Sequence, residues 1–147
     1  MPVSLVIDAN VVTKLYIPEV LADRAEKLFI RVEKGETSFV VPDLIYAEIG
    51  NVLWKKHRLK ELTTTEIQEI LNQVLTIPFI VIAAKSLFEL SIDLSVAYDM
   101  TVYDALYVSA ATIYKTKLVT ADKKIVEKLN NTALRKNIVW LGDIKSY

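Results

Sequence analysis

The sequence predicts an α/β fold, a three-layer sandwich in which a central parallel sheet of about five strands lies between helices on both faces. Short apolar runs of strand length alternate along the chain with longer segments whose apolar residues recur at helical spacing. Strands that alternate with helices are typical of parallel sheets covered on both sides. The 147 residues contain three glycines and no linker or low-complexity tract, so we expect a single domain over residues 1–147.

The first elements follow from local signals. The apolar run Val3–Ile7 predicts a strand, and Asn10 is the expected cap of a short helix that ends near Pro18. Residues 19–34 place their apolar side chains on one helical face, and Gly35 ends that helix.

Capping signals mark two further helices. Asp43 is the expected cap of a helix that follows the second strand, and Thr63 with Glu66 forms a capping box at the start of the next helix. The remaining apolar periods predict strands at residues 38–41, 79–83, 117–119 and 138–141 and helices at residues 43–58, 63–75, 84–98, 101–116 and 122–130.

Four carboxylates stand where a soluble domain would normally place apolar residues. Asp8 and Asp122 closely follow apolar strands, and Glu48 and Asp104 lie in helices that are otherwise largely apolar. A buried charge is costly unless it is paired, hydrogen-bonded or bound to metal. Because parallel α/β sheets bind ligands beyond the carboxyl ends of their strands, where strand order reverses, we expect the four side chains to meet there.

Each acid also has a purely structural interpretation. Asp8 can begin a turn, Asp122 can cap the following helix, and Asp104 can complete a capping arrangement with Thr101. Glu48 is harder to explain in this way, because its place on the helical wheel points it toward the sheet with no cation nearby in sequence.

Three uncharged polar residues, Asn10, Asn51 and Thr120, accompany the acids and are expected to hydrogen-bond them. The chain has no cysteine and one histidine, His57, which nearly excludes metal sites built from thiolate or imidazole. Clustered carboxylates suit the hard cations Mg²⁺ or Mn²⁺. The residues therefore predict a metal-dependent enzyme that acts on phosphate.

The segments around these acids, residues 5–10, 46–53, 103–111 and 118–122, resemble the four motifs of PIN domains. More closely, the chain resembles VapC-type toxin ribonucleases of prokaryotic toxin–antitoxin pairs, in the expected order and over essentially its whole length. The resemblance implies a PIN-like sandwich. It also implies a catalytic and metal-binding quartet, whose members are Asp8, Glu48, Asp104 and Asp122. Asn10 and Thr120 are implied as supporting polar residues. The first motif often has serine or threonine where this chain has Asn10.

The resemblance further implies an endoribonuclease that uses a metal-activated water and is silenced by a cognate antitoxin. Such a water needs no ribose 2′-hydroxyl as nucleophile, so the expected products carry 5′-phosphate and 3′-hydroxyl ends. Two alternatives remain: an RNA-processing PIN nuclease without antitoxin, and a non-catalytic, receiver-like acidic binding module. A receiver would place a carboxylate pair after the first strand, where this chain has Asp8-Ala9-Asn10.

The densest basic stretch, residues 55–60, has two interpretations. Its cations can complement the carboxyl end of a helix in solvent, or they can form a rim that binds RNA phosphates. In the second case the candidate RNA-binding residues are Lys14, Lys55, Lys56 and Arg58. Lys14 is the weakest of these candidates.

Bulk composition constrains partners and location. Eighteen basic and eighteen acidic residues balance, so net charge gives no sign of nucleic-acid binding. The hydrophobic fraction of 52% is high for a small monomer, which predicts a homodimer, or a complex with antitoxin, on the helical surface near the N-terminal half. With no signal-like N-terminus, no apolar run of membrane-span length and no cysteine, we expect a cytoplasmic protein without membrane contact.

Overall fold

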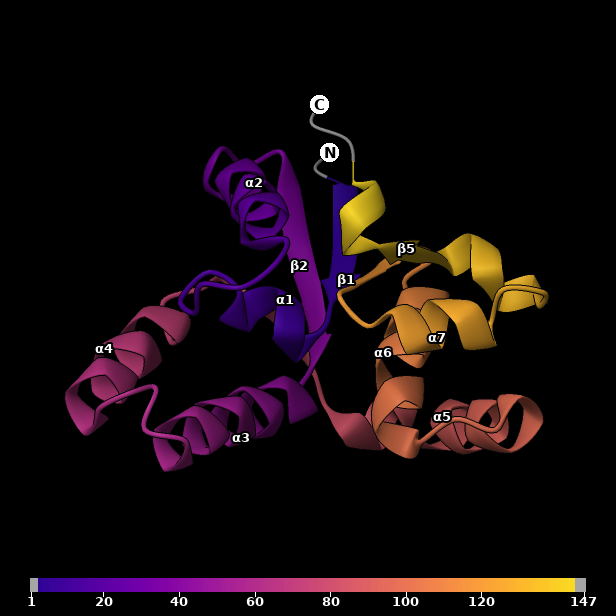
Figure 1. Ribbon diagram of the computed structural model, residues 1–147. Coiled ribbons are helices and arrows are strands. Elements are labelled where there is room, and N and C mark those ends of the chain that lie inside the picture. The colour runs from indigo at the N-terminus through magenta and orange to yellow at the C-terminus, as the bar shows by residue number, and fades with distance from the viewer. Residues whose placement is uncertain (1–2, 145–147) are drawn as a thin grey trace.

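The computed structural model describes residues 3–144 and contains a five-stranded sheet between two layers of helices (Figure 1). The strand order is β3-β2-β1-β4-β5, and every neighbouring pair is parallel. The strands are β1 Val3–Ile7, β2 Thr37–Pro42, β3 Ile80–Ile82, β4 Leu118–Thr120 and β5 Ile138–Trp140. The predicted fold class is confirmed.

The helices divide between the two faces of the sheet, with α1 to α4 on one side and α5 to α7 on the other (Figure 1). The α-helices are α1 Ala9–Thr13, α2 Ala22–Glu33, α3 Leu44–Arg58, α4 Thr64–Val74, α5 Ala84–Tyr98, α6 Val102–Ile113 and α7 Lys123–Lys128. Two short 3₁₀ segments, Ala133–Asn137 and Leu141–Asp143, flank β5.

Each face of the sheet has its own hydrophobic core, because successive residues of a strand point to opposite faces. Val6 and Val40 pack with α5, α6 and α7. Their neighbours Ile7 and Val41 pack with α1 to α4 on the opposite face. Burial on both faces explains why β1 and β2 are almost continuously apolar in sequence.

The start of α1 differs from the prediction, in which Asn10 is the cap. Asp8 is the cap instead: its backbone is extended and its Oδ1 accepts from the Val11 N–H at 3.0 Å. Asn10 already lies in the first turn, and the helix ends at Thr13, before Pro18. An aspartate that ends a strand can cap the next helix directly, which leaves no room for a second cap.

The following helix, α2, begins at Ala22 rather than at residue 19, after Leu21 in a left-handed conformation with φ 70°. Asp43 stands at the cap position of α3, but its side chain makes no cap hydrogen bond there. Its Oδ1 accepts from the Ala84 N–H at 3.1 Å and so serves the start of α5. Asp43 can reach the start of α5 because the adjacent parallel strands β2 and β3 end side by side.

The capping box of α4 forms as predicted, with the Thr63 N–H donating to Glu66 at 2.7 Å and the Glu66 N–H to Thr63 at 3.1 Å. Within residues 3–144, no helix is both long enough and apolar enough to cross a membrane.

Candidate active site

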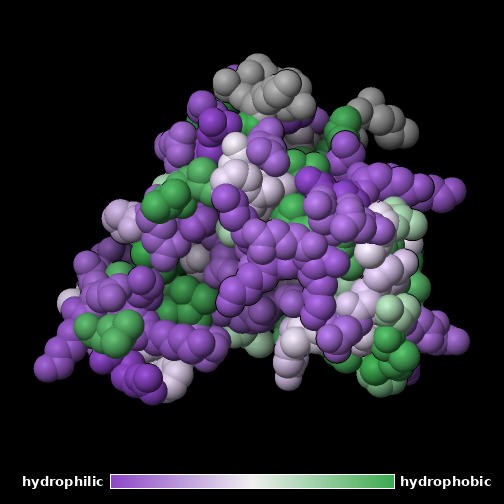
Figure 2. All heavy atoms as spheres, turned by 45° about the vertical axis from the view of Figure 1, so that its right-hand side comes forward, coloured by the Kyte–Doolittle hydropathy of each residue, from purple (hydrophilic) through white to green (hydrophobic). Residues whose placement is uncertain are grey.

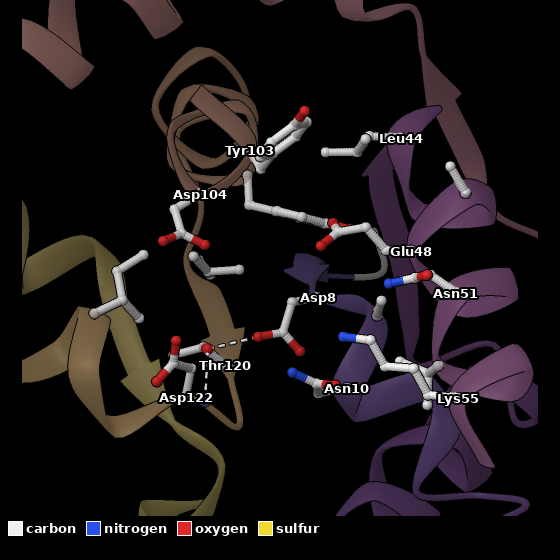
Figure 3. A pocket seen from close by; sticks show the side chains of 16 residues that line it. Asp8, Asn10, Leu44, Glu48, Asn51, Lys55, Tyr103, Asp104, Thr120 and Asp122 are labelled. Carbon is white, nitrogen blue, oxygen red and sulfur yellow. Dashed lines mark hydrogen bonds between the residues drawn. The ribbon is translucent and has the colours of Figure 1, made fainter. Parts of the chain in front are cut away.

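A cavity of about 460 Å³ opens at the carboxyl ends of β1 and β4 (Figure 3). The chain runs outward from β1 to β2 and β3, then returns to β4 on the other side of β1, so strand order reverses at this point. Ligands of parallel α/β sheets bind at such reversals. The cavity is lined by all four predicted acids, Asp8, Glu48, Asp104 and Asp122.

The side of the cavity built from strand ends holds its acids through a chain of hydrogen bonds. Thr120, the last residue of β4, donates from Oγ1 to Oδ2 of Asp8 at 2.6 Å (Figure 3). The same Oγ1 accepts from the Asp122 N–H at 3.0 Å. Asp122 caps α7 by accepting from the Lys124 N–H at 2.9 Å. Thr120 therefore holds the carboxylate of Asp8 and the backbone of Asp122, so its hydroxyl contacts an acid of the cavity.

Asp8 combines this hydrogen bonding with a raised pKa. The pKa of its carboxyl is raised from the usual 3.8 to about 6, mainly by burial and to a smaller extent by the negative charge of Glu48. The Thr120 hydroxyl and the backbone N–H groups of Val11 and Ala121 oppose this shift, because they stabilise the ionised form. The site thus holds a carboxylate that is costly to ionise in the absence of a cation.

The opposite side of the cavity is built from helices. Glu48 projects from α3 toward the acids of the strand ends (Figure 3). Its pKa is raised by burial, lowered by the nearby Tyr107 hydroxyl and raised again by the charge of Asp104. Among the described residues, however, neither the buried Oε1 of Glu48 nor the buried hydroxyl of Tyr107 completes a hydrogen bond.

Asp104 lies in the first turn of α6, where its N–H donates to Oγ1 of Thr101 at 3.1 Å. Burial raises the pKa of its carboxyl, as does the charge of Asp122, while Thr101 and Lys128 lower it. Lys128, at the end of α7, also contacts Asp99 in the turn before α6. Both interpretations of Asp104 are therefore true: it belongs to a Thr101 cap and it faces the other acids.

The other predicted site residues separate into two groups. Asn10, Asn51 and Lys55 line the cavity, although within residues 3–144 neither asparagine hydrogen-bonds an acid. The remaining three basic residues are engaged elsewhere: Lys14 pairs with Glu19, Lys56 pairs with Glu19 and Glu61, and Arg58 packs over the Trp54 ring.

Tyr107 is a cavity residue that the sequence analysis did not single out. It lies three positions after Asp104 in an apolar segment, where a tyrosine is typical of a core, and its side chain is only 3% exposed. The i, i+3 spacing places Tyr107 on the same face of α6 as Asp104, and that spacing is the signal by which it could have been found.

The donor set fits a hard divalent cation. The four acids offer only oxygen ligands, and the raised pKa values of Asp8, Glu48 and Asp104 reflect burial together with mutual repulsion, which a cation would relieve. Within the described residues, no three acidic, histidine or cysteine side chains are arranged so that they could hold a metal ion together. Mg²⁺ needs fewer protein ligands, because it is commonly held by one or two carboxylates, several waters and substrate phosphates.

The fold and the position of the acids define the class of protein. Residues 5–129 match the PIN domain family, and the chain belongs to that family. Its sequence is 32% identical over 128 residues to Ribonuclease VapC3 from Pyrobaculum aerophilum, an alignment that covers 85% of this chain and 94% of the relative. The resemblance to VapC-type PIN domains is confirmed.

Two solved structures are similar to the fold. The crystal structure of PAE2754 from Pyrobaculum aerophilum has a TM-score of 0.70 and 26% identity, covering 95% of this chain and 85% of that chain. The toxin-antitoxin complex from Klebsiella pneumoniae has a TM-score of 0.62 and 17% identity, covering 95% of this chain and 99% of that chain. At 17% identity the second similarity concerns the fold alone.

Proposed function

We propose that this chain is a divalent-metal-dependent endoribonuclease and the toxin of a toxin–antitoxin pair, with residues 1–147 acting as one nuclease domain. The observation that carries the proposal is the convergence of Asp8, Glu48, Asp104 and Asp122 on one cavity at the reversal of strand order. Membership of the PIN family and similarity to a relative named a ribonuclease support it.

The chain's own residues hold the cation and orient the scissile phosphate. The four carboxylates are the proposed ligands of Mg²⁺ or Mn²⁺, which supplies Lewis acidity that lowers the pKa of a water and offsets charge on the phosphate. Thr120 keeps Asp8 and Asp122 in place through the two hydrogen bonds described above. Asn10 and Asn51 line the same cavity and are proposed to hydrogen-bond RNA or the cation's waters.

Lys55 is the basic residue proposed to bind an RNA phosphate beside the acids. It lies on α3 two turns after Glu48 and lines the cavity (Figure 3). Lys14, Lys56 and Arg58 are proposed as weaker contributors, because each already has a partner within its own chain. The Lys55 ammonium beside the acids would offset part of their repulsion of the RNA backbone at the point of cleavage.

Cleavage of RNA by the purified chain with Mn²⁺ tests the function. We expect internal cuts with 5′-phosphate and 3′-hydroxyl ends, identified by mass analysis of the fragments, and no cuts in excess chelator. Products ending in 2′,3′-cyclic phosphate, or undiminished cleavage with chelator, would contradict a metal-activated water. RNA binding without any cleavage would favour the non-catalytic alternative.

The proposed antitoxin is a small protein that covers the acidic cavity. Co-expression with the product of an adjacent small reading frame tests this: we expect a stable complex in which RNA cleavage is lost. An active nuclease with no such partner would favour an RNA-processing enzyme instead. A cytoplasmic location belongs to the same proposal, because the RNA substrate and the antitoxin would be there.

The proposed homodimer is better placed on α5 than on the N-terminal helices. Phe88, Ile92 and Val96 recur every four residues on one face of α5, with exposed fractions of 60%, 39% and 82%. Hydrophobic side chains gather at the lower right of Figure 2, the corner that holds α5 in Figure 1. Two antiparallel copies of α5 centred on Ile92 would place Phe88 opposite Val96 and Lys85 opposite Asp99. Light scattering should show a dimer that I92E dissociates.

A further inference from the structure

Two buried oxygen atoms on the helix side of the cavity lack hydrogen-bond partners. They are Oε1 of Glu48 and the hydroxyl of Tyr107, and within residues 3–144 neither forms a hydrogen bond. Both side chains line the same cavity, Glu48 from α3 and Tyr107 from α6, and the Tyr107 hydroxyl lowers the pKa of Glu48. Buried polar atoms without partners are uncommon in folded proteins, and each costs about 1–3 kcal/mol in desolvation.

Packing explains the ring of Tyr107 but not its hydroxyl. The side chain is 3% exposed and belongs to the core formed by α5, α6 and the sheet, where phenylalanine would bury the same ring without a polar atom. The hydroxyl instead reaches the cavity, where it lies between Glu48 and the backbone N–H of Ala9. Ala9 directly follows Asp8, so Tyr107 lies between the two sides of the site.

This position determines what the hydroxyl can do. A protonated phenol has one O–H to donate and lone pairs to accept with. The Ala9 N–H can only donate, and an ionised carboxylate can only accept, so the phenolic proton is directed toward Glu48. A hydrogen bond to an ionised carboxylate is shorter and stronger than one between neutral groups.

We propose that Tyr107 is a positioning residue whose O–H donates to the ionised Glu48 carboxylate when a divalent cation binds, holding one carboxylate oxygen so that the other faces the cation. The inference rests on the proposed function, because it assumes that Glu48 is a ligand. Residues that hydrogen-bond a metal ligand orient it, and their loss commonly weakens metal affinity or activity by 10- to 100-fold. Binding of the cation would then form the hydrogen bond that Glu48 and Tyr107 lack.

The test is Y107F in the full-length chain, with Mn²⁺ affinity measured by titration calorimetry and without RNA. We expect affinity to fall by about tenfold, and the melting temperature of the metal-free protein to stay the same or rise, because an unpartnered buried hydroxyl is removed. The rise in melting temperature on adding Mn²⁺ should shrink. Y114F is the matched control: Tyr114 follows the last turn of α6, is 45% exposed and does not line the cavity.

RNA cleavage provides a second readout. Excess Mn²⁺ should restore most of the kcat of Y107F, with the KM for RNA unchanged, whereas a fold damaged by the substitution would not be rescued. In a double-mutant cycle, Y107F should have little further effect on Mn²⁺ affinity in an E48Q background, because the pair is already broken.

Three outcomes would overturn the inference. Parental Mn²⁺ affinity in Y107F would remove the positioning role while leaving the nuclease proposal intact. A metal-free Y107F protein that melts well below the parent would assign the hydroxyl a structural role. No Mn²⁺ binding by the parent chain would overturn the proposed function and this inference together, and that result is distinct from the other two.

Discussion

The two sides of the acidic cavity differ in how completely their polar atoms are satisfied. On the strand side, Asp8, Thr120 and Asp122 form a closed series of hydrogen bonds with one another and with the first turns of α1 and α7. On the helix side, Glu48 and Tyr107 leave buried oxygens without partners. Both sides carry carboxyls with raised pKa values, so the difference lies in hydrogen bonding rather than in burial.

This difference indicates a division of labour. Local backbone geometry fixes the strand side, because a side chain at a strand end also caps the helix that follows. The helix side depends on how α3 and α6 are placed on opposite faces of the sheet, and the like charges of Glu48 and Asp104 repel each other there. The strand side is therefore already assembled, and on the proposed function a bound cation would complete the helix side.

The largest expected effect is a loss of cleavage when one acid is removed, either from the strand side or from the helix side. D8N and D104N should each reduce the cleavage rate by about 100- to 1000-fold, since a bound cation supplies several kcal/mol of transition-state stabilisation and each 1.4 kcal/mol is tenfold. Both variants should fold, because asparagine keeps an acceptor and relieves repulsion among the acids. Single-turnover rates with circular dichroism as the folding control would measure this.

If D8N alone lost activity while D104N cleaved at the parental rate, the helix side would have no part in the chemistry and the division of labour would fail. E127Q is a suitable control, because Glu127 is an exposed acid on α7 that does not line the cavity.

The second effect is on the pH dependence of stability without metal. The folded-state pKa of Asp8 is about 6 and its usual value is 3.8, so the folded protein binds this proton more tightly than the unfolded chain does. The stability contribution is fully present below about pH 4 and is lost as pH rises to about 6, by up to roughly 3 kcal/mol. Urea unfolding in chelator should show the decline.

D8N should remove most of this slope and be more stable than the parent above pH 6, while Mn²⁺ should stabilise the parent but not D8N. A parent whose metal-free stability rises between pH 4 and pH 6 would show that Asp8 is not the dominant titrating group.

The third effect is on stability and on the pKa of Asp8, and it comes from removing the Thr120 hydroxyl on the strand side. T120V keeps the shape of the side chain but removes the donor to Asp8 and the acceptor for the Asp122 N–H, and Thr120 is 1% exposed. We expect a loss of about 1–3 kcal/mol in unfolding free energy. The pKa of Asp8 should rise further, because Thr120 lowers it, and the acid limb of the cleavage profile should move to higher pH.

T112V is the matched control for that experiment. The Thr112 hydroxyl donates to the Val108 carbonyl on α6, away from the acids, so its loss should leave the pH profile unchanged. An unchanged profile in T120V as well would mean that the strand side needs no hydroxyl to position Asp8.

The same division explains how much of the site could be predicted from sequence. The four acids and Thr120 were predictable, because strand ends and helical faces follow from periodicity within one segment. Asp43 was placed at the right helix start, yet its carboxylate serves α5, forty-one positions later, through the pairing of β2 with β3. Tyr107 was not singled out because its residue type and apolar neighbours fit a core, and only the placement of α3 and α6 around one cavity brings its hydroxyl near Glu48.

The smallest expected effect concerns the cation on the helix side, Lys55. Lys55 lines the cavity and, among the described residues, has no ion pair, whereas its neighbour Lys56 contacts Glu61 at 2.8 Å and Glu19 at 3.7 Å. K55Q should weaken RNA binding and reduce the slope of log affinity against log salt by about 0.7, the value for one phosphate contact on a single strand. K56Q removes the same charge one position along α3 and should reduce that slope less, because Lys56 is already paired with two acids. Fluorescence titrations from 50 to 300 mM salt, with D104N as the background to prevent cleavage, would measure both. Equal slopes for the two variants would mean that charge near α3 acts only at long range, and that the helix side makes no phosphate contact through Lys55.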